Sequence, residues 1–147
     1  MKIYLDTCVW CRPFDKPSPR IESERTAYLK ILRKVYEGKF SVVGSVFLDI
    51  EVERIEGEKK RESTKKSMDK VISEKIELVT QEILSRKKEI KKAGLKDMDA
   101  YHVASAVEGG AIYFISVDDE LLGKRDKITG IKIRSPEEFL KEVEYGN

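Results

Sequence analysis

Four acidic residues, far apart along the 147-residue chain, each lie near the end of an apolar run or near the start of a helical pattern: Asp6, Glu51, Asp99 and Asp118. Carboxylates packed into one pocket repel each other, and their pKa values rise unless a cation compensates. Carboxylate oxygens suit Mg²⁺ or Mn²⁺, whereas zinc prefers histidine and cysteine ligands. Such a metal suits phosphoryl transfer, because it lowers the pKa of a bound water and clamps the oxygens of an in-line displacement. We therefore expect Asp6, Asp99 and Asp118 to hold Mg²⁺ or Mn²⁺, with Glu51 completing the pocket and a phosphodiester backbone as the substrate.

Neighbouring residues compete for some of these roles. Helical spacing turns Asp99 toward the apolar face of its helix, so we expect Asp99 to point inward and Asp97 to cap the helix. Glu51 has other acids close by, so simple surface charge is the alternative for it. His102, the only histidine, lies on a mostly apolar helix, and we expect it to be a hydrogen-bonded structural residue.

Two other classes of function compete with the metal-dependent one. Cys8 and Cys11 form a C-x-x-C directly after the first expected strand, so a dithiol redox protein is one alternative. Redox sites of the thioredoxin type open a helix at this point, whereas Arg12-Pro13 disfavours one, and we expect buried cysteines that behave as small hydrophobes. The second alternative is a catalytically silent module that binds RNA or a partner protein and holds no divalent cation tightly.

Strand patterns alternate with helical patterns along the whole chain. We expect strands over residues 1–6, 40–43, 75–79, 111–115 and 131–133, and helices over 20–36, 46–56, 58–73, 81–93, 98–108, 119–124 and from 136 onward. Residues 12–19 hold three of the four prolines and are expected to be a non-helical link. The alternation predicts a doubly wound parallel sheet covered on both faces, in a single domain over residues 1–147. With residues 1–6 as the central strand, Asp6 and Asp118 become neighbours at the chain reversal, where such sheets bind ligands.

The composition sets limits on partners and location. Hydrophobic residues make up 40% of the chain and charged residues 38%, with a net charge of +2, which argues against a strongly cationic arm. A local basic rim around the acidic pocket is compatible with this charge, and its candidates for contacts to flanking phosphates are Arg12, Lys16, Arg20, Lys96, Lys124 and Arg125. No apolar run approaches the roughly 20 residues that span a bilayer, and no charged-then-apolar leader is present. We therefore expect a cytoplasmic protein without a membrane partner.

Four segments resemble, in the same order, the motifs of the PIN-domain (PilT N-terminus) nucleases. Residues 3–7 read IYLDT, like the opening strand, and residues 45–51 read SVFLDIE, like the helix that carries the second acid. Residues 97–106 read DMDAYHVASA, similar to the third segment with its Asp-Ala pair, His and small residues. Residues 114–119 read FISVDD, similar to the fourth, in which Thr or Ser stands two residues before Asp. The ordered set covers most of the chain.

This resemblance implies a three-layer α/β/α fold with a parallel sheet of about five strands, and the activity of a Mg²⁺- or Mn²⁺-dependent ribonuclease. Many members of the family are toxins of toxin–antitoxin pairs and form dimers. RNA, an antitoxin and a second copy of this chain are therefore the implied partners. Residues 12–15 depart from the short-loop toxins, in which the chain goes directly into a helix.

The resemblance also implies roles for individual residues. The acidic site consists of Asp6, Glu51, Asp99 and Asp118. Thr7 and Ser116 orient ligands or water around it. Asp119 is the competitor of Asp118, and Asp118 is favoured because Ser116 stands two residues before it.

Overall fold

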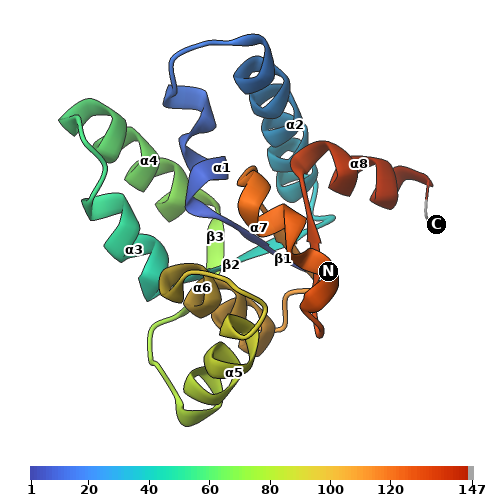
Figure 1. Cartoon of the computed structure of the whole chain (residues 1–147). Coiled ribbons are helices and arrows are strands. Elements are labelled where there is room, and N and C mark those ends of the chain that lie inside the picture. The colour runs from blue at the N-terminus through green and yellow to red at the C-terminus, as the bar shows by residue number, and fades with distance from the viewer. Residues whose placement is uncertain (146–147) are drawn as a thin grey trace.

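A five-stranded parallel sheet lies between two layers of helices in a computed structural model that describes residues 1–145, with the backbone alone at residue 145 (Figure 1). The last two residues of the predicted domain lie outside this range. The strands are β1 (Lys2–Leu5), β2 (Ser41–Ser45), β3 (Ile72–Ile76), β4 (Tyr113–Ile115) and β5 (Lys132–Arg134). Their order in the sheet is β3-β2-β1-β4-β5, so β1 is central as predicted.

Eight α-helices and two short 3-10 helices connect these strands within the described residues. They are α1 (Thr7–Cys11), α2 (Pro19–Tyr36), α3 (Val46–Glu53), α4 (Glu58–Val71), α5 (Gln81–Lys91), α6 (Asp97–Glu108), α7 (Asp119–Gly123) and α8 (Pro136–Tyr145), with η1 (Arg12–Phe14) and η2 (Arg125–Lys127). In Figure 1, α1, α2, α4 and α8 lie on one side of the sheet and α5 and α6 on the other. The predicted three-layer α/β/α fold is confirmed.

The order of the strands creates a crevice beside β1. β1 pairs in parallel with β2 on one side and with β4 on the other, with Tyr4 opposite Val43 and Leu5 opposite Ile115. The chain leaves β1 toward β2 and later returns to the other side as β4, so the connections diverge at the carboxyl ends of β1 and β4. In open α/β sheets this point of divergence is where ligands bind.

Burial of β1 and β4 on both faces explains why they read as continuous apolar runs. Ile3, Tyr4, Leu5, Phe114 and Ile115 are all fully buried. Strands of parallel sheets covered by helices on both sides lack the alternation of half-exposed strands.

Close approach of α6 to the sheet depends on small residues. A Cβ added at Gly109, just after this helix, would lie 2.6 Å from Val43 Cγ1, so a larger residue there would displace the stiff valine. Ala100 and Ala104 are fully buried on the same helix. The small, apolar sequence of α6 therefore sets its distance from the sheet.

The segment after β1 folds differently from the prediction. Residues 12–19 were expected to contain no helix, yet η1 covers Arg12–Phe14, and α1 directly follows β1. Asp6 caps α1 by accepting a hydrogen bond from Thr7 N–H, and Pro13 stands at the start of η1, where its missing N–H costs nothing. The chain therefore enters a helix directly after β1.

Two further boundaries differ from the sequence prediction. β3 begins at Ile72, whereas the sequence predicts a start at residue 75. The prediction misses the true start because Ser73, Glu74 and Lys75 are exposed on this edge strand, which therefore lacks an apolar pattern. Asp97 does not cap α6: the cap position is Lys96.

Of the helices described, none combines the length and apolar character needed to cross a membrane.

Candidate metal centre

Asp6 lies at the carboxyl edge of the sheet, between β1 and β4. Its backbone N–H donates to the carbonyl of Ile115 at 2.9 Å, which extends the β1–β4 pairing by one residue. Its Oδ1 accepts from Thr7 N–H at 2.9 Å, and its Oδ2 accepts from the Ser116 hydroxyl at 2.8 Å. The side chain is 95% buried by these neighbours, since its exposed fraction is 5%. The carboxylate is therefore held in one orientation.

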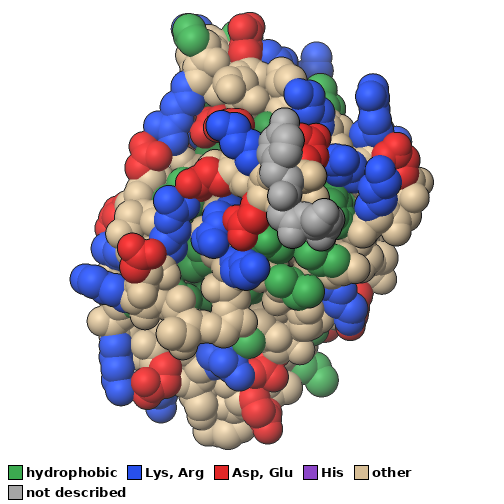
Figure 2. Space-filling model, turned by 90° about the vertical axis from the view of Figure 1, so that its right-hand side faces the viewer, with side chains coloured by type: hydrophobic (Ala, Val, Ile, Leu, Met, Phe, Trp, Pro, Cys, Tyr) green, Lys and Arg blue, Asp and Glu red, His purple; other side chains and the backbone are tan. Residues whose placement is uncertain are grey.

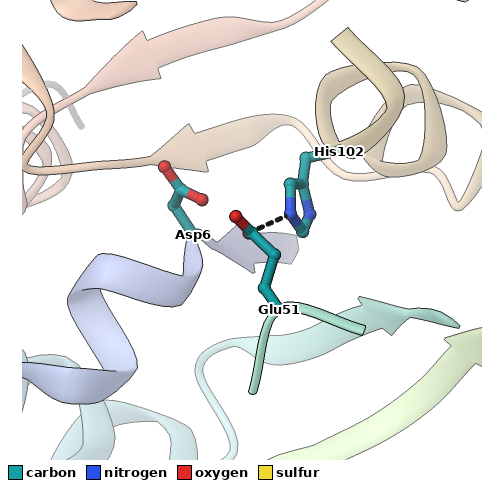
Figure 3. A group of neighbouring side chains, drawn as sticks. All are labelled: Asp6, Glu51 and His102. Atoms are coloured by element: carbon teal, nitrogen blue, oxygen red, sulfur yellow. Dashed lines mark hydrogen bonds and ion pairs between the residues drawn. The ribbon is translucent and has the colours of Figure 1, made fainter. Parts of the chain in front are cut away.

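Glu51 reaches the same pocket from α3 and meets His102 from α6. Figure 3 shows Glu51 between Asp6 and His102, with its carboxylate bonded to the imidazole. Glu51 Oε1 lies 2.5 Å from His102 Nε2 and also accepts from the Thr7 hydroxyl at 2.6 Å. Thr7 therefore links the end of β1 to Glu51, in line with the orienting role implied for it.

A buried relay of hydrogen bonds fixes the other side of the imidazole. His102 Nδ1 lies 2.7 Å from the Tyr4 hydroxyl, and that hydroxyl lies 2.6 Å from Ser45 Oγ. Ser45 Oγ also accepts from Phe47 N–H at 3.2 Å and caps α3. With a neutral imidazole, every group is satisfied when Ser45 donates to Tyr4, Tyr4 donates to Nδ1, and Nε2–H donates to Glu51.

His102 is therefore a positioning residue for Glu51, which agrees with its expected structural role. The imidazole is fully buried and both ring nitrogens are engaged. Burial alone would raise the pKa of Glu51, but its hydrogen bonds with His102 and with the Thr7 hydroxyl hold it below its usual range. Glu51 is thus an ionised carboxylate at neutral pH.

The tightest group of metal-binding side chains is not the predicted one. Asp6, Glu51 and His102 each offer a ligand atom, and these atoms lie within 4.8 Å of one another. Asp99 and Asp118, which were predicted to hold the metal with Asp6, do not belong to this tight group. Within this group, Glu51 and His102 are joined by a hydrogen bond.

Asp99 nevertheless shares the electrostatic environment of the other acids. Burial, together with the negative charges of Asp6, Asp118 and Glu51, raises its pKa to about 6. The pKa of Asp6 is raised as well, first by burial and further by Glu51, against the opposing effects of His102 and the Ser116 hydroxyl. Asp99 is thus close enough to the other three predicted acids for their charges to act on it.

Asp118 and Asp119 have different surroundings. Asp118 caps α7 through Oδ1, which accepts from Glu120 N–H at 2.9 Å, and its own N–H donates to Ser116 Oγ at 3.1 Å. Asp119 pairs instead with Arg20, and both of its carboxylate oxygens accept hydrogen bonds from the guanidinium at 2.8 Å. Ser116, fully buried, therefore connects the Asp118 backbone to the Asp6 carboxylate, as its implied orienting role requires.

Most of the cations predicted to form a basic rim are engaged within the protein. Within residues 1–145, five of the six lie in ion pairs: Arg12 with Asp15 and Glu24, Arg20 with Glu24 and Asp119, Lys96 and Lys124 with Glu120, and Arg125 with Glu138. These pairs compete with any phosphate contact. The pairs of Arg20 with Asp119 and of Lys96 with Glu120 join residues far apart in the sequence, so no local pattern indicates them.

The two cysteines are free thiols on α1. Burial, and then the negative charge of Asp6, raise the pKa of Cys8 well above its usual range, and burial raises that of Cys11. Cys8 Sγ lies 3.5 Å from both Asp6 Oδ2 and Ser116 Oγ. Since the thiolate is the reactive form, these surroundings disfavour the dithiol redox alternative.

Fold and pocket together define a doubly wound α/β protein with an acidic candidate site at its switch point. In fold the chain is similar to a chain in the crystal structure of VapBC2 from Rickettsia felis bound to a DNA fragment from their promoter, with a TM-score of 0.64 and 14% sequence identity. The match covers 92% of this chain and 98% of that one, and VapBC2 is a PIN-domain toxin–antitoxin complex. The fold is thus the PIN fold that the motifs predicted. No protein-family model and no curated protein matches the sequence.

Proposed function

We propose that this protein is a divalent-metal-dependent ribonuclease that hydrolyses RNA phosphodiester bonds. The observation that carries the proposal is the position of Asp6, buried at the carboxyl end of the central strand and within 4.8 Å of Glu51 through their ligand atoms. Asp6, Asp99 and Asp118 are the proposed metal ligands, and Glu51 completes the pocket.

The donor set fits Mg²⁺ or Mn²⁺. The pKa values of Asp6 and Asp99 are both raised, first by burial and then by the negative charges of neighbouring acids. A divalent cation would offset this negative charge. The oxygen ligands suit a hard cation, and the one nearby imidazole is already used by two hydrogen bonds. When bound, such a metal supplies an activated water and neutralises charge on the scissile phosphate.

The protein's own residues hold the acids in place. Ser116 and Thr7 fix the orientation of Asp6, while His102 and Thr7 fix that of Glu51 through Oε1. Within the described residues, the other oxygen of Glu51 has no hydrogen-bond partner. It is therefore the group that we assign to orient the attacking water and accept its proton.

A toxin role and its partners are part of the proposal. The solved structure with the same fold comes from a toxin–antitoxin complex, and this supports an antitoxin as partner. RNA as substrate, a homodimer and a cytoplasmic location stay predictions from the sequence.

Cleavage of a labelled RNA in the presence of Mn²⁺ or of a chelator tests the proposal. Asp6→Asn should abolish cleavage and weaken Mn²⁺ binding measured by calorimetry, while Asp69→Asn, an exposed acid on α4, serves as the matched control. Circular dichroism checks that both variants fold. Cleavage that persists in Asp6→Asn contradicts the assignment. A folded wild-type protein that neither binds Mn²⁺ nor cleaves RNA would favour the silent binding module.

A further inference from the structure

Arg20, in the first turn of α2, forms hydrogen bonds with the residues on both sides of Asp118. Its Nη1 and Nη2 donate to the two carboxylate oxygens of Asp119, each at 2.8 Å. Nη2 also donates to the carbonyl of Val117 at 3.0 Å. One planar guanidinium therefore holds the residue before Asp118 and the residue after it. Bidentate pairing of this kind fixes geometry as well as charge.

The same short loop is anchored from the inside of the molecule. Ser116 Oγ accepts from Asp118 N–H at 3.1 Å and donates to Asp6 Oδ2 at 2.8 Å. Asp118 thus lies between an inner anchor, which joins it to Asp6, and an outer anchor, which is Arg20. With Asp119 turned toward Arg20, Asp118 is the acid left on the side of the pocket.

Arg20 is itself positioned by a buried acid. Its Nε donates at 3.3 Å to Glu24, which is only 5% exposed. Glu24 also accepts from Arg12 at 2.8 Å, and Arg12 pairs with Asp15 at 2.6 Å. The outer anchor is therefore continuous with a row of alternating charges that runs through η1 and α2.

Few donors remain on Arg20 for a substrate. A guanidinium has five N–H groups. Four are committed within the protein: one to Glu24, one to Val117, and two to Asp119. A role as a phosphate contact would require Arg20 to give up some of these bonds.

We propose that Arg20 is a positioning residue that fixes Asp118 in the metal centre by holding Val117 and Asp119. This inference rests on the proposed function, because Asp118 matters only if the acids bind a metal. Both side chains are exposed, at 55% for Arg20 and 75% for Asp119, so the pair adds little to stability. The loss of this pair alone, as in Asp119→Ala, should therefore appear in metal affinity and catalysis and not in the unfolding midpoint.

Mn²⁺ binding by calorimetry, paired with RNA cleavage, tests this role on the full chain. Arg20→Ala should raise the Mn²⁺ Kd by about tenfold or more, the usual effect of losing an outer partner of a ligand. Arg86→Ala removes a comparable exposed pair between α5 and α6, with Glu108 at 3.1 Å, and should leave the Kd unchanged. In an Asp118→Asn background, Arg20→Ala should add no further loss.

Asp119→Ala separates positioning from phosphate binding, because the two roles predict opposite signs. If Arg20 holds the loop, Asp119→Ala weakens Mn²⁺ binding as Arg20→Ala does, although Arg20 keeps its bond to Glu24. If Arg20 serves substrate phosphates, Asp119→Ala frees the guanidinium and lowers the KM for RNA, which overturns the inference. Equal Kd values for Arg20→Ala and Arg86→Ala overturn it as well. Failure of the proposed function looks different, since the wild-type protein itself then binds no Mn²⁺.

Discussion

Replacing Asp99 with asparagine should make the metal-free protein more stable at neutral pH. Asp99 lies in the first turn of α6, and within residues 1–145 its carboxylate has no hydrogen-bond partner. Asparagine has almost the same shape and carries no charge. The substitution therefore removes the cost of burying a charged carboxylate, and the repulsion from neighbouring acids, without removing a hydrogen bond.

The magnitude follows from the pKa of Asp99, which rises from 3.8 to about 6 on folding. Two pKa units correspond to about 3 kcal/mol, and partial exposure of the site reduces this to about 2 kcal/mol. The folded protein binds this proton more tightly than the unfolded chain, so wild-type stability falls as pH rises from about 4 to about 6. The advantage of Asp99→Asn is therefore absent below about pH 4 and complete above about pH 6.

Thermal and urea unfolding in a chelator measure this effect. At about pH 8, Asp99→Asn should raise the unfolding midpoint by about 4 to 8 °C for a chain of this size. Asp97→Asn, two residues earlier, is the matched control with the opposite sign. The hydrogen bonds from Lys87 and then Lys91 hold the pKa of Asp97 below its usual range, so its neutralisation should lower stability slightly.

In saturating Mn²⁺, the wild-type protein should become more stable than Asp99→Asn, the reverse of their order in the chelator. A ligand at about 100 times its Kd stabilises the folded state by about 2.7 kcal/mol, and the variant should lack most of this gain. The reasoning is refuted if Asp99→Asn is no more stable than wild type in the chelator at about pH 8. It is refuted equally if Mn²⁺ stabilises both proteins by the same amount.

Three other substitutions or treatments test separate features. Tyr4→Phe leaves a buried imidazole nitrogen unpaired and should destabilise the fold by about 1 to 3 kcal/mol in urea titrations, so an unchanged midpoint would argue against the relay. Cys8 and Cys11 should react with a thiol reagent at about pH 7 only as fast as the protein unfolds, whereas rapid labelling of the native protein would revive the redox alternative. Gly109→Ala should cost about 1 to 3 kcal/mol in thermal unfolding, because its Cβ would lie 2.6 Å from Val43 Cγ1, and a neutral result would show that the sheet gives way there.

The sequence predicted those parts of the fold that local pattern controls. β1 and β4 read clearly because they are buried on both faces, and Asp6 was recognised because it ends the first of these apolar runs. The edge strand β3 was displaced in the prediction, since its exposed residues carry charge and give no apolar signal. Helix α1 differs from the prediction because Arg12-Pro13 limits only its length: the helix ends at Cys11, just before them.

The sequence singled out Asp6 and Glu51, and their ligand atoms lie within 4.8 Å of each other and of His102. The metal-binding roles of Asp99 and Asp118 stay predictions. The contact of Tyr4 with His102 spans 98 positions and that of Arg20 with Asp119 spans 99. Contacts over such distances depend on the tertiary fold, and no local pattern in one sequence reports them.

Charged side chains are exposed on both edge strands of the sheet, β3 and β5. Ser73, Glu74 and Lys75 are exposed on β3, and Lys132 is exposed on β5. Figure 2 shows the side of the molecule that carries α8, where basic and acidic side chains alternate around smaller apolar areas. Edge strands that carry exposed charged side chains resist pairing with the edge strands of another molecule. The protein should therefore remain free of fibrils when concentrated, and any dimer should assemble through its helices.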